Sequence, residues 1–90
     1  MGIGIVIPQF LRHLTNDVEV VNVSGRTVGE CLNDLVKQFP VLKASLFNKR
    51  GGLIDFLEVY INSDSAYPRE LTKPVKDGDI LQIMYALVGG

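Results

Sequence analysis

The chain has 90 residues, of which 47% are hydrophobic and 21% are charged, and nine Lys and Arg against ten Asp and Glu give a net charge of −1. This length allows one domain, and the composition excludes an intrinsically disordered chain. The near-neutral charge argues against a protein held to nucleic acid by the phosphate backbone, because such binding needs a basic stripe.

Two strands are expected in the first quarter of the chain. Residues 3–8 are β-branched and apolar and end at a proline, and residues 18–23 are rich in valine and follow the turn-forming Asn16 and Asp17. These patterns predict two strands joined in a hairpin. The residues of the second strand that we expect to lie nearest the core are Val18, Val20 and Val23.

A helix is expected to begin after Thr27. Thr27 and Glu30 fit a capping box, in which the threonine side chain accepts a hydrogen bond from the Glu30 backbone and the Glu30 side chain reaches back. The apolar residues that follow recur at helical spacing, which predicts one buried face. They are Val28, Cys31, Leu32, Leu35, Val36 and Phe39. Pro40 is expected to end the helix.

The second half of the chain is expected to supply the remaining strands. A further short turn of helix is predicted over residues 41–47, with Leu42 and Leu46 inward, and a loop over residues 48–52. Strands are predicted over residues 56–62, 70–72 and 80–86, the last after the turn-forming residues 77–79. The resulting order, β-β-α-β-(β)-β, predicts an α+β fold with a mixed four- or five-stranded sheet and one main helix across it.

The single cysteine and the single histidine are the first candidates for side-chain chemistry. Cys31 lies on the apolar face of the helix, and no Lys, Arg or His lies one helical turn away to depress its pKa. We therefore interpret it as a core residue. His13 lies in a predicted loop with no orienting group nearby, which favours a solvated side chain. One Cys and one His cannot form a four-ligand zinc site or an internal disulfide, so no metal is expected.

The class and location of the protein follow from its size and its apolar runs. A core of this size leaves little room for a large active-site cavity, which favours a carrier, adaptor or binding module over an enzyme. The first residues lack the basic segment of a signal peptide, and the longest apolar run, residues 83–88, is far shorter than a membrane span. We expect a soluble, cytoplasmic protein with neither nucleic-acid nor membrane partners.

The chain ends in Gly89 and Gly90, directly after the last predicted strand. A frayed end built of small residues is one interpretation. The other is a reactive end, because residues 87–90 in extended form reach up to roughly 13 Å. Without Cβ atoms, the two glycines would let the backbone pass into a narrow site of a partner. We predict one domain over residues 1–86 and a flexible tail over residues 87–90.

Five motifs together resemble the MoaD/ThiS family of sulfur carriers, which have the ubiquitin-like β-grasp fold. In chain order they are residues 7–12 (IPQFLR) with Thr15, the capped helix from Thr27, residues 59–62 (VYIN), residues 76–79 (KDGD) and the terminal Gly89 and Gly90. The resemblance spans nearly the whole chain. The chain departs from the family pattern at Tyr85, where the family often has proline, and at Ser63, where it often has glycine.

The resemblance implies a reaction at the chain end. A ubiquitin-activator-like adenylyltransferase, using ATP and Mg²⁺, would join AMP to the Gly90 carboxylate. Sulfur from a donor protein, a rhodanese or a cysteine desulfurase, would then replace the AMP. The resulting thiocarboxylate would serve an acceptor synthase in cysteine, homocysteine or molybdopterin synthesis. Leu87, Val88 and Gly89 would contact the partner, and the carrier itself would bind no cofactor and be a co-substrate rather than an enzyme.

Two alternatives stay open on the sequence. The chain could be a ubiquitin-like modifier that is joined to lysines of other proteins through Gly90. It could also be a β-grasp binding module whose tail is inert. Lysine adducts that carry Gly-Gly would distinguish the first, and full function after removal of Gly90 would distinguish the second.

Overall fold

The structure is a computed structural model that describes residues 2–86, so the predicted tail over residues 87–90 lies outside the described residues. Five strands form one mixed sheet in the order β2-β1-β5-β3-β4. They are β1 (Ile3–Val6), β2 (Val20–Val23), β3 (Leu57–Ile61), β4 (Asp64–Ser65) and β5 (Ile80–Tyr85). The central pair β1 and β5 is parallel, and the other neighbouring pairs are antiparallel. This confirms the predicted α+β fold with a mixed sheet.

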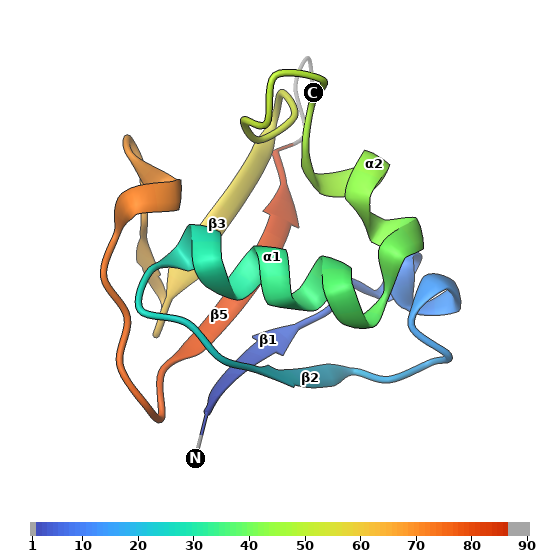
Figure 1. Cartoon of the computed structure of the whole chain (residues 1–90), viewed down its shortest axis with the longest axis horizontal. Helices are drawn as coiled ribbons and strands as arrows, with labels where there is room; N and C mark the ends of the chain where they lie inside the picture. Colours follow the sequence, from blue (N-terminus) through green and yellow to red (C-terminus); the bar gives the residue numbers. More distant parts are fainter. Residues whose placement is uncertain (1, 87–90) are drawn as a thin grey trace.

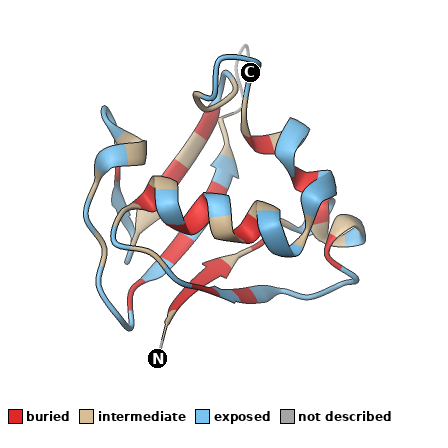
Figure 2. Cartoon of the chain, in the orientation of Figure 1, coloured by how far each residue is buried: buried red, intermediate tan, exposed pale blue. Residues whose placement is uncertain are grey.

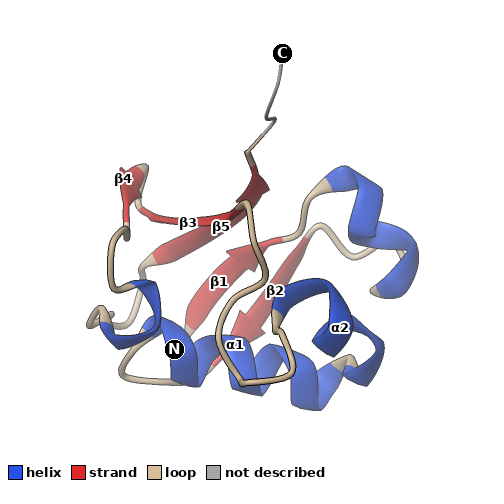
Figure 3. Cartoon of the chain, turned by 90° about the horizontal axis from the view of Figure 1, so that it is seen from above, coloured by secondary structure: helices blue, strands red, loops and turns tan. Residues whose placement is uncertain are grey.

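One main helix, α1 (Val28–Gln38), lies across a single face of the sheet (Figure 1). A short helix, α2 (Lys43–Leu46), lies on the same side (Figure 3). Three 3₁₀ turns complete the described part of the chain, and they span Gln9–Leu14, Pro40–Leu42 and Glu70–Thr72. The predicted helical turn over residues 41–47 is confirmed, and both leucines expected to point inward, Leu42 and Leu46, are buried.

The start and the buried face of α1 follow the sequence pattern. The Thr27 hydroxyl accepts a hydrogen bond from the Glu30 backbone N–H at 3.2 Å. The Glu30 carboxylate reaches back to the N–H of Arg26, one residue before the cap, at 2.8 Å. The fully buried residues of the helix face the sheet (Figure 2), and they are Val28, Cys31, Leu32 and Leu35. Val36 and Phe39 pack at the margin of this core.

The predicted inner face of β2 is wrong in part. Val21 and Val23 are buried, whereas Val18 and Val20 are exposed. The register with β1 is the reason, because Val21 pairs with Ile5 and Val23 with Ile3. Directly paired residues point to the same face of a sheet, so the two core isoleucines decide which valines turn inward. A shift of one residue along the strand exchanges the two faces.

The predicted strand over residues 70–72 is also wrong, because these residues form a 3₁₀ turn. The additional strand is β4, which pairs with the end of β3 across a tight turn at Asn62 and Ser63. Both turn residues have positive φ, 49° and 76°. A two-residue hairpin turn of this kind needs that conformation, which the chain achieves here without glycine.

A side-chain network joins two of the motifs that carried the resemblance. The buried Asp79 carboxylate accepts hydrogen bonds from the Lys76 backbone N–H and from the Asn62 side chain, both at 2.9 Å. Asn62 also accepts a bond from the Ile80 backbone N–H at 2.9 Å. The network therefore fixes the β3–β4 turn to the start of β5.

We expect Asp79→Asn to lower stability at neutral pH and to flatten its pH dependence. The hydrogen bond from the Lys76 backbone, followed by that from Asn62, holds the pKa of Asp79 below its ordinary value. A carboxyl whose pKa is depressed on folding stabilises the native state above its unfolded pKa, near 4, and loses that effect as the pH falls through its folded pKa. Urea unfolding midpoints over a pH series measure this. The exposed neighbour Asp77 gives the matched control Asp77→Asn, and equal pH profiles for the two variants would contradict the prediction.

Candidate functional site at the end of β5

The predicted reactive tail begins where β5 ends. β5 lies between β1 and β3 in the sheet; β1 pairs with it as far as Gln82, and its last residues, 83–85, pair with β3 alone. Beyond Tyr85, the Ala86 backbone N–H donates to the Phe56 carbonyl at 2.7 Å and extends the pairing with the β3 side by one residue. The chain is therefore fixed to the domain up to the last described residue, from which residues 87–90 follow.

Tyr85 is anchored to two other elements. Its hydroxyl donates a hydrogen bond to the Ser45 carbonyl in α2. Its ring packs edge-to-face against Phe10, with 5.0 Å between ring centroids and an interplanar angle of 67°. Burial raises the pKa of Tyr85 above its ordinary value, so the hydroxyl stays protonated as a donor at neutral pH. The residue that departs from the family pattern is thus a tether at the root of the tail.

The motif at residues 7–12 holds Phe10 in this position. The Arg12 side chain donates from Nε to the Ile7 carbonyl at 3.0 Å, across the 3₁₀ turn. The buried Thr15 hydroxyl lies 3.3 Å from the Arg12 carbonyl and 3.0 Å from that of Val18, and closes the other end of the turn. The polar residues of this motif therefore shape the turn, and the turn presents Phe10.

An apolar surface surrounds the root of the tail. Phe10 is 57% exposed, Met84 49% and Phe56 60%. A shallow groove of about 350 Å³ lies between the turn at residues 8–12 and the end of β5, and its lining includes Phe10, Met84 and Tyr85. Large exposed apolar side chains that gather in one place are typical of protein-contact surfaces.

The four residues predicted to react or to contact a partner, Leu87, Val88, Gly89 and Gly90, lie outside the described residues. The structure adds three residues to which the sequence assigned no role: Phe10, Phe56 and Tyr85. Phe10 reaches Tyr85 through the parallel pairing of β1 with β5, and Phe56 reaches Ala86 through the antiparallel pairing of β3 with β5; no local pattern signals either pairing. The sequence contained one signal for this surface, the IPQFLR motif, whose aromatic residue Phe10 is exposed and is not part of the core.

The side chains first considered for chemistry take no part in this site. Cys31 is fully buried in α1, and its burial, followed by the charges of Asp34 and Glu30, raises the pKa of the thiol to about 11. The interpretation of Cys31 as a core residue is confirmed. His13 is exposed in the 3₁₀ turn. Within residues 2–86 no three His, Cys, Asp or Glu side chains are placed to share a metal ion, and no helix is long and apolar enough to cross a membrane.

We expect Cys31→Ala to leave sulfur loading unchanged. A thiol with a pKa near 11 is almost wholly protonated at neutral pH, and the thiolate is the nucleophilic form. The variant removes one buried sulfur atom, so its cost should appear in the thermal unfolding midpoint only. Mass spectrometry of protein loaded with ³⁵S-sulfide and then digested locates the label. Sulfur loading that falls in the variant, at an equal folded fraction, would contradict this expectation.

The mixed sheet with α1 across one face defines a ubiquitin-like β-grasp domain, whose last strand is anchored at Tyr85 and Ala86. The sequence model described as the ThiS family matches residues 5–90, and the chain belongs to that family. The sulfur carrier protein CysO of Mycobacterium tuberculosis is 30% identical over 93 residues, which cover all of both chains.

Solved structures agree with this assignment. A chain of the BexX/CysO complex of Amycolatopsis orientalis superposes with a TM-score of 0.87 at 34% identity, over 98% of this chain and 99% of that one. SAMP1 from Haloferax volcanii, a small archaeal modifier protein, superposes with a TM-score of 0.79 at 28% identity, over 100% of both chains. The predictions of the β-grasp fold, of the family and of a sulfur carrier are confirmed by these full-length similarities.

Proposed function

We propose that this carrier is loaded with sulfur at Gly90 and serves cysteine-type biosynthesis. A carboxylate oxygen of Gly90 attacks the α-phosphorus of ATP and pyrophosphate leaves. Sulfide then attacks the acyl carbon and AMP leaves, which yields a thiocarboxylate. The observation that carries the proposal is the similarity to CysO, which extends over the whole of both chains, together with a family match that runs through residue 90.

The chain contributes position rather than catalytic side chains. The Ala86–Phe56 hydrogen bond and the Tyr85 tether fix the point from which the tail leaves. A fixed origin reduces the volume that the terminal carboxylate explores, which favours its entry into a partner's site. The apolar surface around this origin, which includes Phe10 and Met84, supplies contacts for that partner.

The proposal assigns the remaining parts of the reaction to other proteins. ATP and Mg²⁺ bind to a ubiquitin-activator-like adenylyltransferase, so this chain holds no cofactor and is a co-substrate rather than an enzyme. A rhodanese or a cysteine desulfurase supplies the sulfur as a cysteine persulfide, from which a thiol reductant releases sulfide, and an acceptor synthase receives the sulfur from the thiocarboxylate. The presence of CysO in a complex with BexX supports a carrier that docks on a partner protein. Because adenylation of the carrier depends on ATP, we place the reaction in the cytoplasm.

Mass spectrometry of the C-terminal peptide tests the proposal. The full chain is incubated with the adenylyltransferase of the same cell, ATP, Mg²⁺ and sulfide. We expect the peptide to gain the mass difference between sulfur and oxygen at Gly90, and we expect pyrophosphate to be released when sulfide is left out. An unmodified peptide with no released pyrophosphate would contradict the proposal.

One observation favours a second function, conjugation to other proteins. SAMP1 is a small archaeal modifier protein and is 28% identical to this chain over its full length. The same Gly90 adenylate would then be attacked by a lysine amine instead of sulfide. The higher identity to CysO, up to 34%, favours the carrier. Lysine residues joined to Gly90 of the peptide 77–90, which trypsin releases because Lys76 is the last basic residue of the chain, would establish the modifier.

A further inference from the structure

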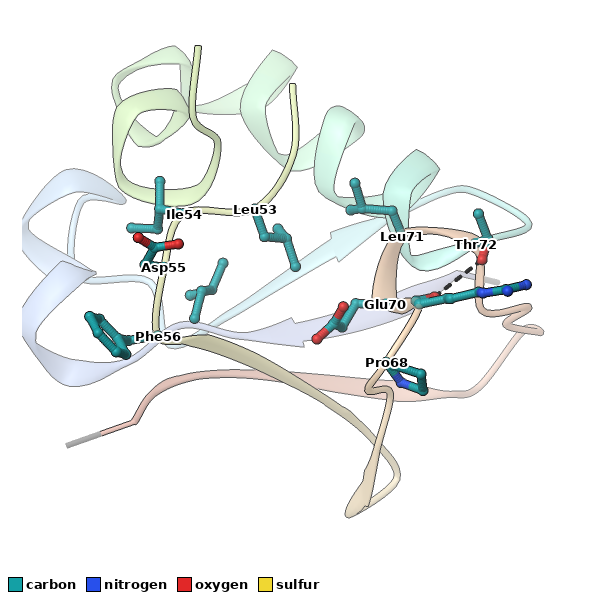
Figure 4. Close-up of a pocket in the computed structure, with 10 residues that line it drawn as sticks. Leu53, Ile54, Asp55, Phe56, Pro68, Glu70, Leu71 and Thr72 are labelled. Carbon is teal, nitrogen blue, oxygen red and sulfur yellow. Dashed lines mark hydrogen bonds between the residues drawn. The ribbon is translucent and has the colours of Figure 1, made fainter. Parts of the chain in front are cut away.

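A second groove lies on the β3 side of the tail root (Figure 4). Its walls are the loop at residues 53–57 and the segment at residues 68–72, which face each other across a space of about 460 Å³. An adjoining space of about 430 Å³ shares Phe56, Leu57 and Glu70 with it and reaches Ala86. We treat the two adjoining spaces together as the groove, and the second of them reaches the root of the tail at Ala86.

The groove exists because β4 is too short to cover the edge of β3. β4 pairs only with Tyr60 and Ile61. One further hydrogen bond, from the Ala66 N–H to the Val59 carbonyl at 2.9 Å, extends this contact. Beyond it the chain leaves the sheet, and within residues 2–86 no strand lies beside Leu57 and Glu58 on that side. An uncovered strand edge flanked by apolar side chains is a surface suited to another chain.

Phe56 lines both spaces and has an unusual backbone conformation. Its φ is +68°, a region that bulky residues rarely adopt. Its carbonyl is held by the Ala86 N–H, and its ring is 60% exposed. Tyr67, on the opposite wall, is 75% exposed. Such outliers concentrate at functional sites, where the surrounding structure holds them in place.

The charged residues of the groove are mostly acidic. Asp55, Glu58 and Glu70 line it with one cationic side chain, Arg69. Surfaces that meet in a complex carry complementary charge, so this lining fits a basic partner. The exposed rings of Phe56 and Tyr67 fit an apolar side chain between the basic ones.

We propose that this groove is a docking surface for the adenylyltransferase, which seats in it a segment with an apolar side chain flanked by Lys or Arg. The inference rests on the proposed function, because an enzyme that takes up residues 87–90 must lie against whatever adjoins Ala86. Contact at the groove orients the domain while the tail enters the active site. The groove thus contributes to binding of the carrier and not to the chemical step.

Two full-chain variants and two matched controls test the groove. Phe56→Asn removes the ring and keeps a residue that tolerates positive φ. Glu70→Lys reverses one charge. The controls are Val41→Ala, at an apolar residue 57% exposed on the helical side, and Glu19→Lys, at an exposed residue beside the opposite edge of the sheet. Thermal unfolding followed by circular dichroism verifies that each variant is folded.

Titration calorimetry with the adenylyltransferase gives the Kd, and pyrophosphate release gives kcat. We expect each groove variant to raise the Kd about tenfold with kcat unchanged, and each control to match the wild type. The Glu70→Lys effect should shrink as salt is added, whereas the Phe56→Asn effect should persist. If the groove variants have the same Kd as the controls, the proposal that the groove is a docking surface is overturned and the proposed function is not. If the groove variants bind more weakly but neither the wild type nor any variant releases pyrophosphate, the proposed function is overturned and the docking surface is not. A wild-type chain that does not bind the enzyme overturns both.

Discussion

Removal of Gly90 is expected to abolish formation of the thiocarboxylate. The deletion withdraws the terminal carboxylate by one residue, about 3.3–3.6 Å along an extended chain. A displacement of only ~1 Å at a reacting atom can cost about a hundredfold in rate, so the loss should exceed that factor. The fold should be unchanged, because within residues 2–86 the sheet contacts of β5 are complete without Gly90. Mass spectrometry of the C-terminal peptide and circular dichroism measure the two effects separately.

An additional glycine after Gly90 is the matched control for this deletion. It keeps the glycine composition of the end and displaces the carboxylate by the same distance in the other direction. We expect a comparable loss, because the position of the carboxylate is what the adenylyltransferase requires. Sulfur loading of the deleted chain at the wild-type rate would show that the tail is inert and would favour a binding module.

The helix could be predicted closely because its signals are local. The cap at Thr27, the apolar spacing and the stop at Pro40 each act within a few residues of their own position. The structure places the helix over Val28–Gln38 with the expected face buried. The same holds for the turn at residues 77–79, where Gly78 adopts a φ of +92°.

The face of β2 could not be predicted, because it depends on a partner strand. Successive valines at positions 20 and 21 fit either face equally well. The pairing of Val21 with Ile5 decides between them, and that register comes from the hairpin as a whole. The strand expected at residues 70–72 failed for a related reason. A segment of three residues is too short to show the alternation of apolar and polar residues that indicates a strand, and residues 70–72 form a 3₁₀ turn here.

The sequence predicts a site at the chain end, which stays a prediction because residues 87–90 lie outside the described residues, but it did not predict the neighbours of Ala86. The glycines and the motifs identified the family from the sequence alone. The neighbours of the tail root, Phe10 from one end of the chain and Phe56 from its middle, meet Tyr85 and Ala86 only after the sheet has formed. Contacts between residues so distant in sequence leave no periodic trace, so they require the topology.

Leu35→Ala is expected to destabilise the domain by about 2–5 kcal/mol, the range for a buried leucine truncated to alanine. Leu35 is fully buried on the face of α1 that covers the sheet. Small domains are stable by only about 5–15 kcal/mol, so this one substitution removes a large part of the total. Urea unfolding with linear extrapolation measures the difference.

Val41→Ala is the matched control for this truncation, because Val41 is 57% exposed and its loss should cost no more than about 0.5 kcal/mol. Equal costs for the two variants would show that α1 does not pack as described.

The same pair separates stability from function. Leu35 lies on α1 and the tail root on β5, so folded Leu35→Ala protein keeps the Tyr85 tether and the Ala86–Phe56 bond. Its sulfur loading, measured well below the unfolding temperature and divided by the folded fraction, should equal that of the wild type.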